Sequence, residues 1–346
     1  MHLPLLHSLA PFLDLVAIFV VIGALIARLW IFVPRQRIAG EWPSALVQET
    51  THDLLGRILP GALALLSFTS VLVLLVRTAE MGQRPILDAF TILPMVVQKT
   101  HFGAIWQVRS LALGILWLAW TASRTRAQIP SALAMFVCAS VIAWSYSASG
   151  HAADRGDFTL QQWFDWLHVM AGALWAGSVL VTAHIMRKLQ PWSALPNRHD
   201  AAAALTRLSQ LATWALLAVL AGGGANAYQR LGAISDLWTT DYGLLLTGKL
   251  CLVAAMIGLG GLNRFYGLRR ICASTGAGAA ARQTDIAPLL RTFRARLRWE
   301  AGLALAVLLC VSVLIHSMPP MRPNPNLPSP PPHHSNLPTH KDPPTP

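Results

Sequence analysis

Charged residues are scarce in this sequence. Lys, Arg, Asp and Glu together make up 12% of its 346 residues, which is about half the share found in ordinary soluble domains. Hydrophobic residues make up 54%, and the mean hydropathy is +0.48. Apolar stretches recur along nearly the whole chain and leave no room for a large soluble core. The composition therefore excludes a soluble globular protein and indicates one that spans a membrane.

Cysteine is also rare, and its placement excludes a disulfide framework. Of the four cysteines, Cys138, Cys251 and Cys310 fall in apolar stretches and Cys272 falls in a basic segment. The sequence contains no Cys-x-x-Cys-His, so covalent attachment of a c-type haem is excluded. It also contains no glycine-rich phosphate-binding loop, so ATP is not the evident source of energy.

Eight apolar stretches are long enough to cross a bilayer as helices, which takes about 20 residues each. They are predicted at residues 11–33, 54–77, 103–122, 130–149, 163–186, 207–228, 243–264 and 299–317. The predicted fold class is therefore an all-α polytopic membrane protein with eight transmembrane helices. The lipid bilayer is its first expected partner.

The basic residues predict the orientation of these helices. The loops after the first, third, fifth and seventh spans, with the adjoining helix ends, hold 18 of the 27 Lys and Arg residues, and the opposite loops and tail hold 7. The other two, Arg109 and Lys249, lie within spans. Basic loops face the cytoplasm, so both termini are predicted to lie on the outer side. The net charge of +12 then comes mostly from basic residues at the cytoplasmic surface of the membrane, next to anionic lipid headgroups. No nucleic-acid partner is expected.

Two short segments match at an offset of 140 residues. Thr100–Gly103 opens the third span and has Arg109 six residues beyond its glycine, while Thr240–Gly243 opens the seventh span and has Lys249 six residues beyond its glycine. Two halves of four spans each would be parallel repeats. The alternative is that both segments are only helix starts of the same kind at the membrane surface. Arg109 and Lys249 would then reach lipid headgroups or pair with carboxylates.

The repeat divides the chain into two predicted halves and a tail. Residues 1–149 form the first four-helix half, and residues 150–317 form the second. Residues 318–346 contain 12 of the 23 prolines. A segment of that composition is predicted to be a disordered tail on the outer side.

Histidine and methionine gather on the predicted outer side of the membrane. Nine of the twelve histidines lie there. Imidazole binds copper, zinc, iron and nickel, whereas thioether sulfur favours Cu(I). The mixture predicts a site for a copper ion, as Cu(I) or Cu(II). The candidate ligands are His101, His151, His168, His316, Met170, Met318 and Met321.

His168 is a better candidate than most because it lies inside the fifth span, where an ionisable group is costly. Asp165, His168 and Trp175 recur along one face of that helix. Asp165 is expected to accept the second imidazole N–H and so to fix the tautomer, and Trp175 is expected to wall the site. The alternative is a packing seam of small and aromatic residues around a hydrogen-bonded histidine.

Three carboxylates lie in or near the spans. They are Asp14, Asp165 and Glu300. Each could carry a proton or pair with a nearby cation. The sequence alone assigns no coupling ion.

Motifs along the last four spans carry a resemblance to a known family. They are His168 with Trp175-Ala176-Gly177, Gly222-Gly223-Gly224 with Asn226, Thr239-Thr240, Tyr242-Gly243 with Lys249, Asn263-Arg264, and Glu300. In this order the chain resembles the bacterial copper-resistance CopD family of inner-membrane proteins, most closely from Trp163 to Pro319. The resemblance implies an eight-helix protein that handles copper at the periplasmic membrane and passes it inward. It also implies a separate partner, a small periplasmic copper carrier of the CopC type.

The sequence therefore predicts a copper transporter of the bacterial inner membrane, with both termini periplasmic, rather than an enzyme. It is expected to move copper from the periplasm to the cytoplasm. The alternative is a haem-binding membrane oxidoreductase in which two of His101, His168 and His316 clamp a haem. A third interpretation is a structural subunit whose histidines are merely interfacial.

Overall fold

The structure is a computed structural model. It describes residues 3–32, 45–124, 128–150, 156–188, 198–274, 287–315 and 317. Over these residues the chain is helical apart from short turns and contains no strand. The longer elements are α1 (Leu3–Ile26), α2 (Ala45–Gly82), α3 (Ala89–Lys99), α4 (His101–Ser123), α5 (Gln128–Ala148), α6 (Leu160–Gly172), α7 (Ser178–Lys188), α8 (Arg198–Arg230), α10 (Asp241–Leu262) and α12 (Ala287–Leu314). The shorter ones are η1 (Ala27–Ile31), η3 (Ile86–Asp88), η5 (Ala173–Gly177), α9 (Asp236–Thr239), η7 (Asn263–Leu268) and α11 (Arg269–Ala273).

Eight helical segments of the described chain are long and apolar enough to cross a membrane, which confirms the predicted fold class. They are His7–Ile31, Asp53–Gly82, His101–Ser123, Pro130–Ala148, Leu160–Lys188, Ala202–Arg230, Asp241–Ala273 and Pro288–Leu314. The fifth span is built from α6, the π-helical turn η5 and α7. Several helices continue beyond the predicted apolar stretches, because backbone hydrogen bonding does not stop where apolar residues stop.

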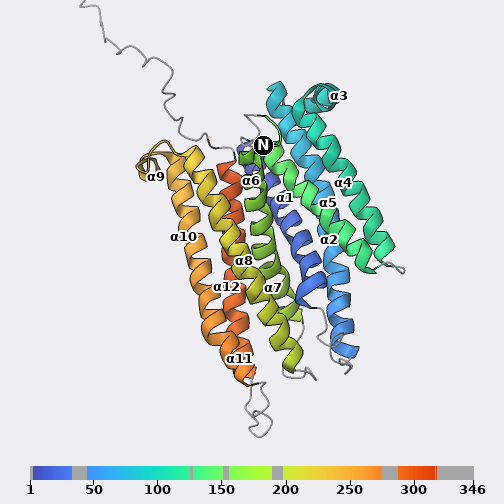
Figure 1. Ribbon diagram of the computed structural model, residues 1–346. Helices are drawn as coiled ribbons and strands as arrows, with labels where there is room; N and C mark the ends of the chain where they lie inside the picture. The colour runs from blue at the N-terminus through green and yellow to red at the C-terminus, as the bar shows by residue number, and fades with distance from the viewer. Residues whose placement is uncertain are drawn as a thin grey trace, which may run out of the picture.

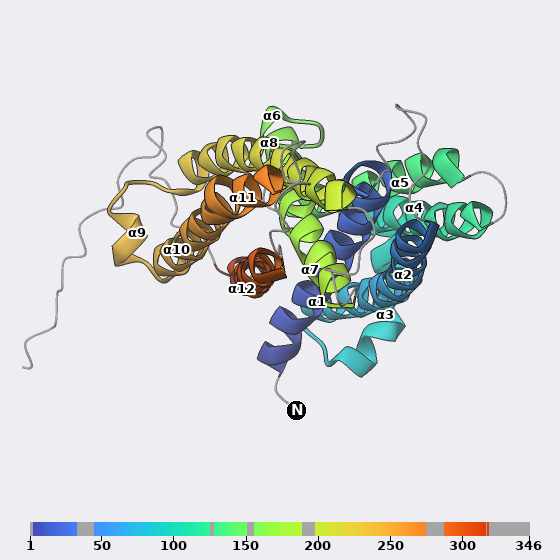
Figure 2. The same cartoon turned by 90° about the horizontal axis from the view of Figure 1, so that it is seen from below.

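The spans run side by side and define two ends of the bundle (Figure 1). The N-terminus, α3 and α9 lie at one end, and α11 lies at the other. We name these the α3/α9 end and the α11 end. Seen along the bundle, α2 to α5 form one group and α8 to α12 form another, with α1 and α7 between them (Figure 2).

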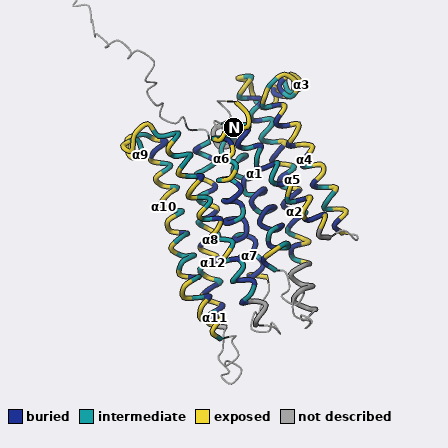
Figure 3. Tube along the Cα trace, in the orientation of Figure 1, coloured by how far each residue is buried: buried dark blue, intermediate teal, exposed yellow. Residues whose placement is uncertain are grey.

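The first and fifth spans form the centre of the molecule. Among the residues of their most apolar windows, 61% and 72% are buried, against 17% in α8 and 11% in α10. Figure 3 shows the same contrast, with buried residues concentrated along α1 and α7. Helix α1 packs against α2 and α5 on one side and against η5, α7 and α12 on the other. The outer helices therefore face lipid, and α1 joins the two groups.

The matched segments at positions 100 and 240 share a local geometry. The side chains of Thr100 and Thr240 cap α4 and α10 by accepting a hydrogen bond from the backbone N–H of Gly103 and Gly243, each at 3.0 Å. A Cβ at either glycine would overlap a backbone carbonyl of the short helix before it, α3 or α9. Both segments thus turn a surface helix sharply into a span, and the 4+4 repeat stays a prediction.

Candidate functional site

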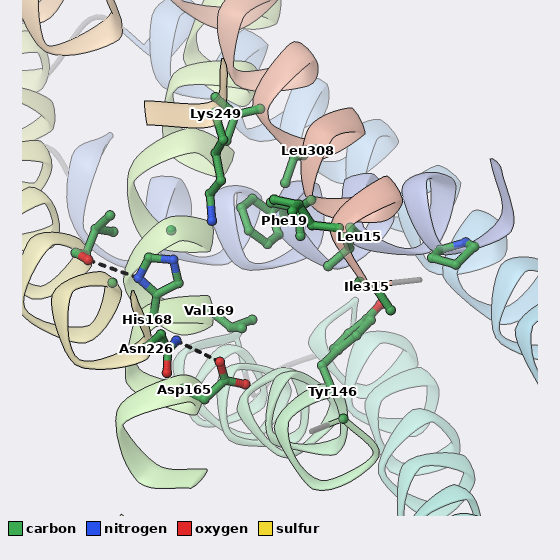
Figure 4. Close-up of a pocket in the computed structure, with 18 of the residues that line it drawn as sticks. Leu15, Phe19, Tyr146, Asp165, His168, Val169, Asn226, Lys249, Leu308 and Ile315 are labelled. Carbon is green, nitrogen blue, oxygen red and sulfur yellow. Dashed lines mark hydrogen bonds between the residues drawn. The ribbon is translucent and has the colours of Figure 1, made fainter. Parts of the chain in front are cut away.

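A cavity of about 730 Å³ lies among the spans. Its wall takes residues from α1, α2, α4, α5, α6, η5, α8, α10 and α12. The wall is mainly apolar, but its polar side chains gather in two places. We name these the Asp14 cluster (Asp14, Ser70, Arg109, Ser145 and Tyr146) and the His168 cluster (Asp165, His168, Asn226, Arg230 and Lys249). Figure 4 shows the cavity with Tyr146 of the first cluster and His168, Asp165, Asn226 and Lys249 of the second.

The Asp14 cluster is a buried ion pair whose polar atoms are hydrogen-bonded. Arg109 Nη2 donates to Asp14 Oδ2 at 2.6 Å, and the hydroxyl of Tyr146 donates to the same oxygen. Arg109 also donates through Nε to Ser70 Oγ at 3.2 Å and through Nη1 to Ser145 Oγ at 3.1 Å. Asp14 is fully buried and Arg109 is 8% exposed. The charge of each partner is thus compensated inside the spans, as a buried pair requires.

His168 presents one ring nitrogen to the cavity. Its Nδ1 lies 2.9 Å from the carbonyl oxygen of Val219 on α8. A carbonyl oxygen only accepts, so Nδ1 carries the hydrogen and Nε2 of the neutral ring keeps its lone pair. The imidazole packs on the glycine run of α8, where a Cβ at Gly222 or Gly223 would come within 2.9 or 3.0 Å of the His168 side chain. The glycines therefore make room for a ring whose Nε2 is available to a ligand.

The predicted hydrogen bond between Asp165 and His168 is wrong. Both oxygens of Asp165 are taken by other groups, since Oδ1 accepts from Asn226 Nδ2 and Oδ2 accepts from Ser147 Oγ, each at 2.8 Å. Arg230 Nη2 lies 3.6 Å from Oδ1. Although Asp165 and His168 share a face of α6, they reach different neighbours. A backbone carbonyl, rather than a carboxylate, therefore orients the imidazole.

Lys249 supplies a positive charge beside His168. Its side chain extends from α10 toward the imidazole (Figure 4), and its charge interacts with His168, Asp165 and Arg230. Among the described residues its ammonium makes no hydrogen bond. Lys249 occupies the position that corresponds to Arg109 in the matched segments, but it lacks the close carboxylate partner that Arg109 has.

The structure brings only some of the predicted site residues together. Asp165, His168, Trp175, Asn226, Tyr242 and Lys249 line the cavity. Met170 is buried in the apolar core, and Gly243 packs beneath α9. His101 lies at the α3/α9 end, where its Nε2 is 2.9 Å from the Asp157 carboxylate and its side chain is 53% exposed. His151, His316, Met318 and Met321 lie outside the described residues.

Two consequences follow for the predicted ligand sets. In the described part of the chain no three His, Cys, Asp or Glu side chains form a group that could hold a metal ion. His168 lines the cavity and His101 does not, so the structure does not place these two histidines across one cavity, as the haem alternative requires. Among the residues that the structure describes, His168 is thus the one predicted histidine ligand at the cavity wall.

Sequence reasoning missed Met256 and Tyr146. Met256 is 2% exposed and lines the cavity. The signal that could have found it is a regular spacing, because Tyr242, Lys249, Met256 and Asn263 follow one another at seven-residue intervals. Seven residues are nearly two helical turns, so Tyr242, Lys249 and Met256 lie close to one face of α10, about 10 Å apart along it, and Asn263 follows as the first residue of η7. Tyr146 has no comparable signal, because its partners lie far away in sequence.

These features define an eight-span helical membrane protein whose mainly apolar cavity contains two polar clusters and a histidine nitrogen open to it. Two family models match the chain: copper resistance protein D over residues 202–314, and the copper resistance protein D-like N-terminal domain over residues 3–161. Together they cover most of the sequence. The chain belongs to the copper resistance protein D family.

Three curated proteins are similar to the chain at low identity. Copper resistance protein D of Pseudomonas syringae pv. tomato is 26% identical over 250 residues, which cover 71% of this chain and 78% of that protein. Inner membrane protein YebZ of Escherichia coli (strain K12) is 28% identical over 227 residues, covering 65% and 71%. Copper transport protein CutJ of Bacillus subtilis (strain 168) is 25% identical over 281 residues, covering 78% and 47%. No solved structure matches the chain.

Proposed function

We propose that this protein transports copper ions across the bacterial inner membrane, from the periplasm to the cytoplasm, without catalysing a chemical reaction. In this proposal the α3/α9 end and both termini face the periplasm, and the α11 end faces the cytoplasm. Family membership supports copper handling. The excess of basic residues in the loops that join at the α11 end supports the orientation.

The observation that carries the proposal is the free Nε2 of His168 at the wall of the cavity. Neutral imidazole is a good ligand for copper in either oxidation state. The residues before His151 and His316, Gly150 and Ile315, also line the cavity. We therefore keep His151 and His316 as ligands, and we assign Met318 and Met321 to capture of the ion at the periplasmic surface, where a CopC-type carrier would deliver it.

The interior of the cavity favours passage over tight binding. Lys249 places a positive charge beside His168, and like charges repel. Asp165 offsets part of that charge from the other side of the cluster. Met256 offers a thioether nearly two turns further toward the α11 end, about 10 Å along α10. A copper ion bound at His168 would thus have a soft ligand ahead of it and a repelling charge beside it.

Copper uptake into proteoliposomes tests the proposal. The wild-type protein is expected to bind copper in detergent and to raise copper influx above that of empty vesicles. His168→Ala is expected to lower binding and influx by about tenfold, since one strong ligand is lost. His184→Ala is the matched control, because His184 lies 16 residues further along the same span and does not line the cavity.

The two variants give a clear reading. Gel filtration and thermal unfolding of both in detergent show whether either has simply lost its fold. If a folded His168→Ala protein moves copper as fast as the wild type, His168 is not part of the route. If the wild-type protein neither binds nor moves copper, the proposed function is wrong.

A further inference from the structure

Glu300 is the one buried carboxylate in the described spans that no cation accompanies. Asp14 pairs with Arg109 at 2.6 Å, and Asp165 lies 3.6 Å from Arg230. Glu300, on α12, is 4% exposed and forms no ion pair with any described residue. A buried charge without a partner is costly in the interior of a membrane protein, and such a group is by default a candidate for function.

The partner of Glu300 is an amide. Asn263 Nδ2 donates to Glu300 Oε1 at 2.6 Å. Asn263 is 5% exposed, and its own Oδ1 is buried without a hydrogen-bond partner in the described structure. Glu300 Oε2 faces Gly260, where an added Cβ would lie 3.8 Å away and meet no other atom within 4 Å. The Asn263 Oδ1 oxygen is thus an acceptor without a donor, and there is open space next to the Glu300 carboxylate, at Gly260.

Protonation of Glu300 would supply a hydrogen-bond donor for Asn263 Oδ1. In the charged form, Glu300 accepts from the amide N–H₂ group, as the structure shows. In the protonated form, the carboxylic O–H becomes a donor, and a rotation of the Asn263 amide would let Oδ1 accept it. Each protonation state therefore has a matching orientation of the same amide, and no other residue has to move.

Other charged groups on the helices around Glu300 do not act on it. Arg264 of η7 donates to Ser209 and Thr213 of α8, and Lys249 of α10 points to the His168 cluster. The remaining charged groups and histidines on these elements are His7 and Asp14 on α1, Arg28 on η1, His184, Arg187 and Lys188 on α7, Asp241 on α10, Arg269 and Arg270 on α11, and Arg291, Arg294, Arg296 and Arg298 on α12 itself. Within the described residues, the polar group that acts on the Glu300 carboxylate is Asn263.

The pair lies between the cavity and the α11 end. Asn263, the first residue of η7, follows Lys249 by 14 residues, which is about 21 Å along the helix, and it continues the seven-residue spacing of Lys249 and Met256. Ala304, one turn beyond Glu300 on α12, lines the cavity. An ion that moves along this face from His168 past Met256 reaches Glu300 next.

We propose that Glu300 and Asn263 form a proton-binding site that serves the release of the transported ion. This inference rests on the proposed function. The carboxylic O–H of Glu300 gives its proton to water at the α11 end as the cation arrives, and the carboxylate left behind compensates the charge of the cation. When the ion has left, Glu300 takes a proton back from the same water. No net proton crosses the membrane, and acid at the α11 end opposes transport.

Infrared spectroscopy tests the proton site without requiring transport. A pH-induced difference spectrum of the wild-type protein in lipid is expected to contain, among the C=O stretches of its carboxylic acids, a component that is missing from the spectrum of Glu300→Gln. Glu80→Gln, which removes a carboxylate at the α3/α9 end, is the matched control and is expected to keep the component. If Glu300→Gln and the wild type give the same spectrum, Glu300 does not exchange a proton and the inference is wrong.

Copper uptake then tests the link to release. In vesicles with the α11 end facing inward, acidifying the lumen is expected to slow wild-type uptake, and Glu300→Gln is expected to be about tenfold slower and insensitive to luminal pH. Glu300→Asp is expected to keep the pH dependence. Glu80→Gln, at the α3/α9 end, is expected to behave as the wild type. Wild-type uptake that ignores luminal pH overturns the inference alone, whereas absence of uptake overturns the proposed function.

Discussion

The two cations within the spans play different physical parts. Arg109 is held by Asp14, Ser70, Ser145 and Tyr146, so its charge is compensated in place. Lys249 has no hydrogen bond to a described residue and stands beside a ring nitrogen that faces the cavity. We infer that Arg109 fixes the structure of the first group of helices, while Lys249 acts on what enters the cavity.

Loss of Asp14 is expected to leave Arg109 as an uncompensated buried charge. Asp14→Asn should lower the free energy of unfolding by about 3–5 kcal/mol, the cost of breaking a buried ion pair by removing one partner. Denaturant unfolding in detergent micelles measures this loss.

The matched control is a cation in a more exposed pair. Arg77 contacts Glu80 at 2.9 Å with its side chain 36% exposed, so Arg77→Gln should change the stability by less than about 1 kcal/mol. Equal losses of unfolding free energy in Asp14→Asn and Arg77→Gln would show that burial of the Asp14–Arg109 pair adds nothing to its contribution to stability.

The residues of the site were only partly predictable from the sequence. His168 and Lys249 stand out because an ionisable side chain inside an apolar span is rare. The partner of the imidazole does not stand out, because it is the backbone carbonyl of Val219, 51 residues away, and any residue carries a carbonyl. The same holds for Tyr146, which is 132 residues from Asp14.

At the level of helices, one close contact between spans is a crossing of two glycines. Gly23 of α1 and Gly177 of η5 lie so close that a Cβ built at either one would overlap the backbone of the other helix. Small residues allow such approach between helices in a membrane. This crossing joins α1 to the fifth span beside the cavity.

Gly23→Ala is expected to push the two helices apart. Overpacking of this kind should lower the free energy of unfolding by about 1–3 kcal/mol, because the added methyl meets backbone atoms that cannot rotate away. Gly61→Ala on α2 is the control, since nothing lies within 4 Å of its added Cβ. That change should be neutral or stabilise the protein by up to about 1 kcal/mol through helix propensity. Thermal unfolding in detergent measures the stability of both variants. A Gly23→Ala protein that is more stable than Gly61→Ala would contradict this prediction.

The number of spans was predictable, but their ends and interruptions were not. Each span needs an apolar stretch, and hydropathy finds that directly. The π-helical turns at Ala27–Ile31, Ala173–Gly177 and Asn263–Leu268 depend on local backbone hydrogen bonds that composition does not reveal. The start of α12 at Ala287, before the predicted 299, reflects helix that continues into a basic segment.

At the scale of the whole molecule, the cavity is built by both groups of helices. Its wall includes α2, α4 and α5 from one group and α8, α10 and α12 from the other. The sequence predicted two four-helix halves, and it gave no sign that α1 would stand between the groups. Helix packing across such distances depends on shape complementarity over many side chains, which a single sequence does not display.

The orientation of the whole bundle is testable with introduced cysteines. In a variant without the four native cysteines, Ala233→Cys marks the α3/α9 end and Ala273→Cys marks the α11 end; both positions are exposed. A maleimide that cannot cross the membrane is expected to label Ala233→Cys in spheroplasts and Ala273→Cys only after lysis. The reverse pattern would place the termini in the cytoplasm.

Helix α1 lies at the centre of the bundle, yet it is synthesised before most of the helices that pack against it. Helix α1 packs against segments that are synthesised after it, since Asp14 pairs with Arg109, 95 residues further along the chain, and α1 contacts α12, which begins only at Ala287. Until those segments are translated, the faces of α1 that will be buried must rest in lipid or against an insertase. A nascent chain that stops after α5 therefore leaves exposed the face of α1 that normally packs against η5, α7 and α12. We expect membrane proteases that remove incomplete proteins to recognise this face.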